Sequence, residues 1–121
     1  MAHVLAFIPD LLFGSQVQGS LLAGGHTVEL VGDENGVLGD LPRADALVID
    51  LTDDPARRAG LLQALPTDAR AKVQTLAFYS HVEADVRRMA EEAGFDLVVP
   101  RSRMAREGAE LIVRLIGVPP Q

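Results

Sequence analysis

The sequence has 121 residues, of which 48% are hydrophobic and 23% charged, and this composition is typical of one well-cored globular domain. It contains no cysteine, which excludes disulfides, thiolate catalysis and cysteine zinc sites. The net charge of −6 argues against nucleic-acid binding as the main activity, because proteins that bind a phosphate backbone usually carry a basic face.

The chain begins with a continuous apolar run, Val4 to Ile8, which predicts a strand buried on both faces. The run is not preceded by basic residues of the kind that begin a signal peptide. No apolar run in the sequence approaches the roughly 18–20 residues that a membrane span needs. We therefore expect a cytoplasmic protein without membrane contact.

Asp10 follows the first strand and is expected to cap a helix from Leu11 to Ala23, because its carboxylate can accept free backbone N–H groups. Gly14 and Gly19 are expected to allow this helix to approach the sheet closely. The expected inner stripe of the helix consists of Phe13, Val17 and Leu21.

Two strands are predicted next. The alternation from Thr27 to Val31 indicates an edge or half-exposed strand, and the apolar segment from Ala46 to Ile49 indicates a buried one. Residues 32–43 between them have a weak helical pattern, so any second helix is short or absent. Asp50 stands at the carboxyl end of the third strand.

The second half repeats the alternation of helix and strand. Asp53, Asp54 and Pro55 predict a helix start, and this helix should continue to about Leu65 before residues 66–68 break it. Strands are expected over 73–78 and 97–99. The stripe of the fourth helix consists of Val82, Val86, Met89, Ala90 and Ala93, and that of the fifth of Met104, Gly108, Leu111, Ile112 and Leu115.

Five strands alternating with four or five helices predict a three-layer α/β/α sandwich around a five-stranded parallel sheet, of flavodoxin-like topology. We expect one domain over residues 1–117 and a short tail over 118–121. In such folds, ligands bind beyond the carboxyl ends of the strands.

The order and spacing of these segments resemble a response-regulator receiver domain of the CheY-like type. The resemblance depends on residues 45–50, which end in Asp50, on Ser80 at the end of the fourth strand, and on residues 92–96 and 100–101. In that family the first strand ends in two adjacent acids that hold Mg²⁺, the third in the aspartate that accepts phosphate, the fourth in a hydroxyl residue and the fifth in a lysine.

The resemblance places Asp50 at the phosphoacceptor position, Ser80 at the switch-hydroxyl position, with Tyr79 as the rival alignment, and Arg101 at the lysine position. Ile8 and Pro9 stand where the family has its acidic pair, so the metal site is degenerate.

The metal ligands that remain possible are Asp10, Asp50 and the carbonyl of Thr52, with Asp53 and Asp54 as substitutes. A single carboxylate is a poor magnesium site, so we expect no cofactor and no ordinary magnesium-dependent phosphorylation. Asp50 is instead expected to hydrogen-bond to nearby loops or to Arg101.

These features predict a stand-alone pseudo-receiver that acts as a protein-interaction module in two-component signalling. The alternative is a functional, atypical receiver, phosphorylated at Asp50 in a phosphorelay with Mg²⁺. A small-ligand sensor with an anion or nucleotide at the strand ends is a third possibility.

An enzyme is not expected. Asp50, Ser80 and His81 do not form a hydrolase triad, because adjacent side chains of an extended backbone point apart.

We expect binding of a protein partner, or self-association, through the face made by the fourth helix, the fifth strand and the fifth helix. The arginines expected on this face are Arg87, Arg88, Arg101, Arg103 and Arg106. Arg57 and Arg58 are interpreted as part of a solvated helix face.

Overall fold

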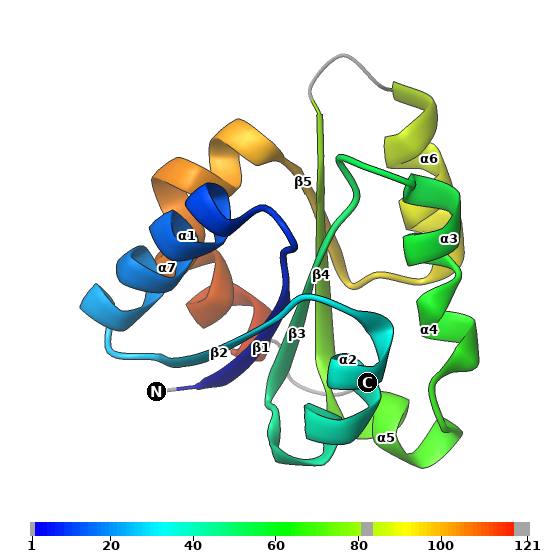
Figure 1. Ribbon diagram of the computed structural model, residues 1–121, viewed down its shortest axis with the longest axis horizontal. Helices are drawn as coiled ribbons and strands as arrows, with labels where there is room; N and C mark the ends of the chain where they lie inside the picture. The colour runs from blue at the N-terminus through cyan, green and yellow to red at the C-terminus, as the bar shows by residue number, and fades with distance from the viewer. Residues whose placement is uncertain (1, 81–83, 118–121) are drawn as a thin grey trace.

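The computed structural model describes residues 2–80 and 84–117, which form a five-stranded parallel sheet with helices on both faces (Figure 1). The strand order is β2-β1-β3-β4-β5. The strands are β1 (His3–Phe7), β2 (Thr27–Val31), β3 (Ala46–Asp50), β4 (Gln74–Tyr79) and β5 (Leu97–Pro100). The predicted α/β/α sandwich with a five-stranded parallel sheet is confirmed.

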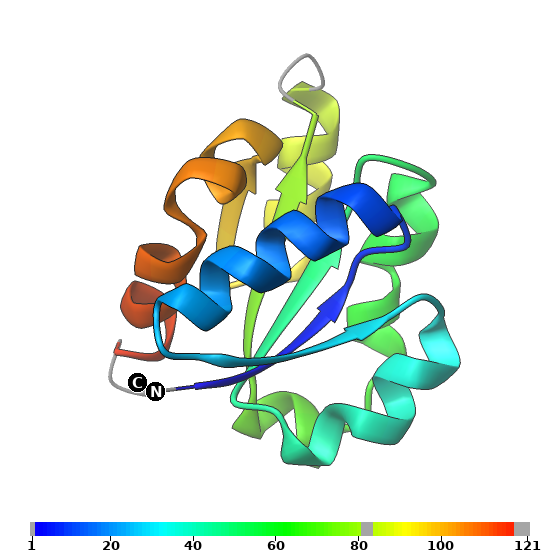
Figure 2. The same cartoon turned by 60° about the vertical axis from the view of Figure 1, so that its left-hand side comes forward.

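Helices α1 (Leu11–Ala23) and α7 (Arg101–Ile116) lie side by side on one face of the sheet (Figure 2). The remaining helices cover the opposite face. They are α2 (Glu34–Asp40), the 3-10 helix η1 (Leu41–Arg43), α3 (Pro55–Ala59), α4 (Leu61–Ala64), α5 (Thr67–Lys72) and α6 (Ala84–Ala93).

The alternating side chains of each strand divide the core into two halves. Val4 and Ala6 of β1 pack with α1 and α7, whereas Leu5 and Phe7 pack with the helices of the opposite face. Hydrophobic burial on both faces explains why the middle residues of the inner strands are apolar.

Helix α1 has the predicted bounds. The Asp10 carboxylate accepts hydrogen bonds from the backbone N–H groups of Leu12 at 3.0 Å and Phe13 at 3.1 Å, so the predicted N-cap is confirmed. The predicted inner stripe is also confirmed, because Phe13, Val17 and Leu21 are all buried.

Of the two glycines expected to permit close helix–sheet contact, Gly14 does so, because a Cβ there would lie 3.3 Å from the Ile8 carbonyl oxygen. The expectation is wrong for Gly19, where a Cβ would meet nothing within 4 Å.

The prediction of one helix from residue 53 to about Leu65 is wrong. Helix α3 ends at Ala59, a separate helix α4 starts after Gly60, and α5 occupies residues for which no helix was predicted. Glycine has a low helix propensity, and this favours the break at residue 60.

The stripes of the last two helices agree with the structure. Val86 and Ala90 of α6 are buried in the core, and the partly buried Met89 and Ala93 pack against the same core, whereas Val82 lies outside the described residues. All five residues of the α7 stripe are buried. None of the helices in residues 2–80 and 84–117 is long and apolar enough to cross a membrane.

Candidate functional site

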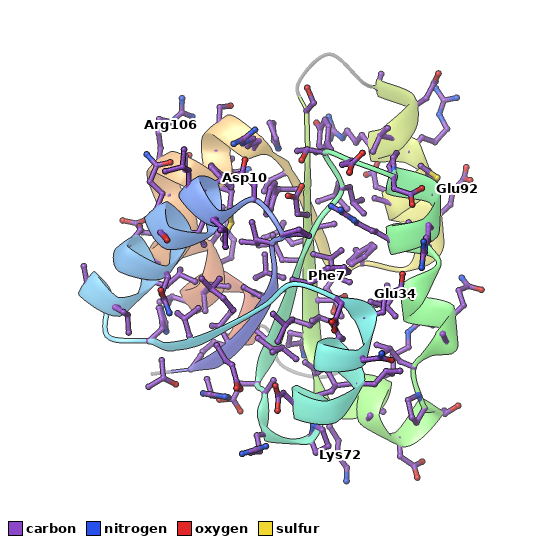
Figure 3. The ribbon with its side chains drawn as sticks, in the orientation of Figure 1. Phe7, Asp10, Glu34, Lys72, Glu92 and Arg106 are labelled. Carbon is purple, nitrogen blue, oxygen red and sulfur yellow. The ribbon has the colours of Figure 1, made fainter. Side chains whose placement is uncertain are left out.

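The candidate site lies at the carboxyl edge of the sheet. Asp50 ends β3 and pairs in register with Phe78 of β4, so Ser80 follows β4 at the same edge. Arg101 follows β5 as the first residue of α7. Figure 3 shows Asp10 at this edge, where β1 leads into α1. The fold thus gathers at one edge the residues that the sequence placed at strand ends.

Asp50 is buried, with 3% of its surface exposed. Its Oδ1 atom accepts two hydrogen bonds from Thr52, one from the backbone N–H at 2.8 Å and one from the hydroxyl at 2.6 Å. Hydrogen bonds to a charged acceptor are among the stronger ones in proteins. The turn that leaves β3 therefore fixes one carboxylate oxygen.

Arg58 of α3 faces the other carboxylate oxygen of Asp50. Its Nη1 atom lies 4.0 Å from Asp50 Oδ2 and donates a hydrogen bond of 3.0 Å to the Asp50 carbonyl oxygen. Its Nη2 atom lies 3.6 Å from Asp53 Oδ2, and its guanidinium carbon lies 5.3 Å from the centre of the Phe7 ring. Only 13% of the Arg58 side chain is exposed.

The interpretation of Arg57 and Arg58 as a solvated helix face is wrong for Arg58. It holds for Arg57, whose side chain is 69% exposed and pairs with Glu34 at 2.9 Å. On the single helix predicted from the sequence, Arg58 would share a face with the apolar Leu61 and Leu62, three and four residues later, and this spacing is a signal that Arg58 faces the core.

The positions of the family's acidic pair offer no side-chain oxygen. Ile8 is buried among the residues that pack against α1 and α7. Pro9 lines a cavity of about 400 Å³ together with Phe7, Glu34, Asp54 and Arg58.

Across residues 2–80 and 84–117, no cluster of three or more histidine, aspartate or glutamate side chains is arranged to hold a metal ion. Mg²⁺ takes oxygen ligands in an octahedron, usually including one or two carboxylates. Asp50 supplies a carboxylate at the phosphoacceptor position, but the guanidinium of Arg58 faces it. The residues at this edge therefore do not fit the magnesium site of a receiver.

Of the two kinds of partner expected for Asp50, the nearby loop is confirmed through Thr52, whereas Arg101 pairs with Asp10. Its guanidinium lies 3.5 Å from Asp10 Oδ2 and 4.2 Å from the centre of the Phe13 ring. Electrostatic attraction to the ring face adds to the ion pair in holding the side chain over α1. Asp50 takes Thr52 and Arg58 as its partners instead.

Ser80 and Tyr79 lie in different surroundings. Ser80 lines a cavity of about 610 Å³ with Thr52 and Arg101, whereas Tyr79 is buried in the core beneath the opposite face of the sheet. Of the two alignments, this geometry favours Ser80 at the switch-hydroxyl position.

The arginines of the expected partner face have acidic neighbours. Arg87 lies 3.6 Å from Glu91 in α6, and Arg103 and Arg106 lie 3.4 and 3.6 Å from Glu107 in α7. These glutamates partly offset the positive charge of the face.

No family model and no curated protein matches the sequence. Solved structures with the same fold cover nearly the whole chain. The receiver domain of the sensor histidine kinase PA1611 from Pseudomonas aeruginosa, solved with a magnesium ion in its active-site cleft, is 19% identical, with a TM-score of 0.78 over 97% of this chain and 98% of its own.

Two further structures are similar. The CheY-like protein tadZ from Pseudomonas aeruginosa is 22% identical, with a TM-score of 0.75 over 100% of this chain and 98% of its own. A response regulator from Thermotoga maritima is 14% identical, with a TM-score of 0.81 over 96% of this chain and 98% of its own. The chain therefore has the fold of response-regulator receiver domains.

Proposed function

We propose that this chain is a pseudo-receiver: a signalling module that uses the receiver fold to bind protein and does without magnesium-dependent phosphorylation of Asp50. It needs no cofactor and catalyses no reaction of its own. The observation that carries this proposal is the replacement of the acidic pair by Ile8, which is buried in the core, and Pro9.

Phosphoryl transfer to Asp50 would place a phosphoryl dianion on a carboxylate. A divalent metal normally offsets that charge and orients the phosphate donor. Asp10 is not available as a substitute ligand, because it caps α1 and pairs with Arg101. Asp50 Oδ1 already accepts two hydrogen bonds. Both facts support a site that does not recruit the metal.

The proposed partner face consists of α6, β5 and α7. Strand β5 is the last strand of the sheet order, so its outer edge pairs with no other strand of the described chain. The helices α6 and α7 both contact β5, and they carry the exposed arginines Arg87, Arg88 and Arg106 and the half-buried Arg103. We propose that a protein partner, or a second copy of the chain, binds there.

Incubation with acetyl phosphate and Mg²⁺, followed by intact-mass spectrometry, tests the absence of phosphorylation. We expect the folded protein to gain no phosphoryl group under conditions that modify an ordinary receiver treated in parallel. A gain in mass that is lost in Asp50→Asn would contradict the proposal.

The second candidate is an atypical receiver that is phosphorylated at Asp50. It is favoured by one observation, that Ser80 lines the same cavity as Thr52 and Arg101 beside the buried Asp50. Beryllofluoride, which mimics the acyl phosphate, would then produce magnesium-dependent NMR shifts around Asp50 and Ser80. The pseudo-receiver proposal requires those shifts to be absent.

A further inference from the structure

We infer that Arg58 is the built-in counter-ion of Asp50 and supplies the positive charge that a divalent cation brings to this edge of the receiver fold. The inference extends the proposed function, because it says what stabilises Asp50 in a site without the metal.

The contacts of Arg58 join three segments of the chain. Its guanidinium reaches Asp50 at the end of β3, Asp53 in the following turn and the ring of Phe7 at the end of β1. Figure 3 shows Phe7 between β1 and the helices that include α3. One side chain from α3 therefore ties together the ends of two central strands and the turn that carries Asp53.

Burial makes this pair different from an ordinary surface ion pair. The side chains of Arg58 and Asp50 are 13% and 4% exposed, so water screens their interaction weakly. At 4.0 Å the two charges attract each other without a direct hydrogen bond, while the hydrogen bond of Arg58 to the Asp50 carbonyl oxygen fixes the position of the guanidinium. Removing one partner would leave an uncompensated buried charge, which is strongly destabilising.

The turn between Asp50 and Arg58 contains one residue in an unfavourable backbone conformation. Asp54 has a φ of 46° and a ψ of 53°, in the left-handed region, and it precedes Pro55. A residue before proline favours extended backbone, so this conformation is held by its surroundings. The backbone N–H of Arg58 donates a hydrogen bond of 3.1 Å to the Asp54 carbonyl oxygen, and this is one of the contacts that hold the turn.

A double-mutant cycle followed by thermal unfolding tests the inference, with Arg58→Met, Asp50→Asn and the double variant. We expect Arg58→Met to lower the Tm by about 10 °C, because it leaves the Asp50 carboxylate buried and unpaired. Adding Asp50→Asn should recover at least half of that loss, because the unpaired charge is then removed.

Arg57→Met is the matched control, since Arg57 is the adjacent residue of the same type but is exposed and pairs only with Glu34 among the described residues. It should change the Tm by no more than about 2 °C, with or without Asp50→Asn. Arg58→Lys retains the charge, and it should keep more of the stability than Arg58→Met.

Additive effects of Arg58→Met and Asp50→Asn would overturn the inference. If Arg58→Met alone does not fold, restoration of a folded protein by Asp50→Asn supports the inference, and a double variant that also fails to fold contradicts it. The phosphorylation assay is independent of the cycle. Phosphorylation of Asp50 in the wild-type protein would refute the proposed function. If Asp50 is not phosphorylated but Arg58→Met and Asp50→Asn show no energetic coupling, only the inference that Arg58 is the counter-ion of Asp50 is refuted.

Discussion

Asp10 has two kinds of partner. Its Oδ1 atom accepts the N–H groups of Leu12 and Phe13, and its Oδ2 atom lies 3.5 Å from the guanidinium of Arg101. The first contact caps α1, and the second connects the start of α1 with the start of α7. Capping satisfies backbone donors that have no partner inside the helix, whereas the half-exposed ion pair is screened by water.

Asp10→Ala is expected to lower the free energy of unfolding by about 1 kcal/mol, because it removes the cap. Asp10→Asn retains a good capping side chain and removes only the charge, so it should cost less than about 0.5 kcal/mol. Urea unfolding of both variants measures the difference. Equal losses would show that the pair with Arg101, and not the cap, is the important contact.

The individual residues of the site show how much of it can be predicted from the sequence. Asp50 ends a strand that the apolar pattern identifies, and Ser80 and Arg101 directly follow two others, so their gathering at one edge follows from parallel pairing. The loss of the acidic pair at Ile8 and Pro9 is visible directly in the sequence once the resemblance is made. The sequence predicts the contact of Asp50 with a nearby loop, but not its pairing with Arg58, because the position of the Arg58 guanidinium depends on how α3 packs on the sheet.

At the scale of elements, the packing of α1 on α7 depends on a residue without a side chain. A Cβ at Gly24 would lie 2.5 Å from the Cβ of Ala109, which is closer than two such atoms can approach. Gly24 has an ordinary φ of −83°, so it is required for space and not for backbone conformation. The end of α1 thus sets how closely α7 can pack beside it.

Gly24→Ala is expected to destabilise the protein by about 1–3 kcal/mol, because it overpacks the contact between the two helices. Adding Ala109→Gly removes the opposing methyl group, so the double variant should lose less than the sum of the two single variants.

Gly19→Ala is the control, because a Cβ there meets nothing within 4 Å and replaces a helical glycine, and it should gain about 0.5–1 kcal/mol. Chemical denaturation measures all four variants. Strict additivity at Gly24 and Ala109 would show that the helices move apart to relieve the contact.

For the molecule as a whole, the net charge of −6 contrasts with the arginines gathered around α6, β5 and α7. Acidic residues alternate with these arginines on α6 and α7, so electrostatic attraction to an acidic partner or a second copy would act only at short range. The glutamates at residues 91 and 107 limit the strength of the patch.

Reversing the charge of two of these arginines, with Arg103→Glu and Arg106→Glu, is expected to weaken association through this face. Light scattering over a range of concentrations should show a mass increase for the wild-type protein that the double variant lacks and that high salt reduces. The control Arg57→Glu changes an exposed charge on another part of the surface and should associate as the wild type does. A wild-type protein that stays monomeric would exclude the second copy as the partner.

Local periodicity and nearby capping residues are enough to predict the strands of the sheet, the bounds of α1, the buried stripes of the last two helices and the position of Asp50. The pairing of Arg58 with Asp50 and of Arg101 with Asp10 depends instead on how the helices pack on the sheet. A long arginine side chain has several acids within reach, and the packing of the helices selects among them.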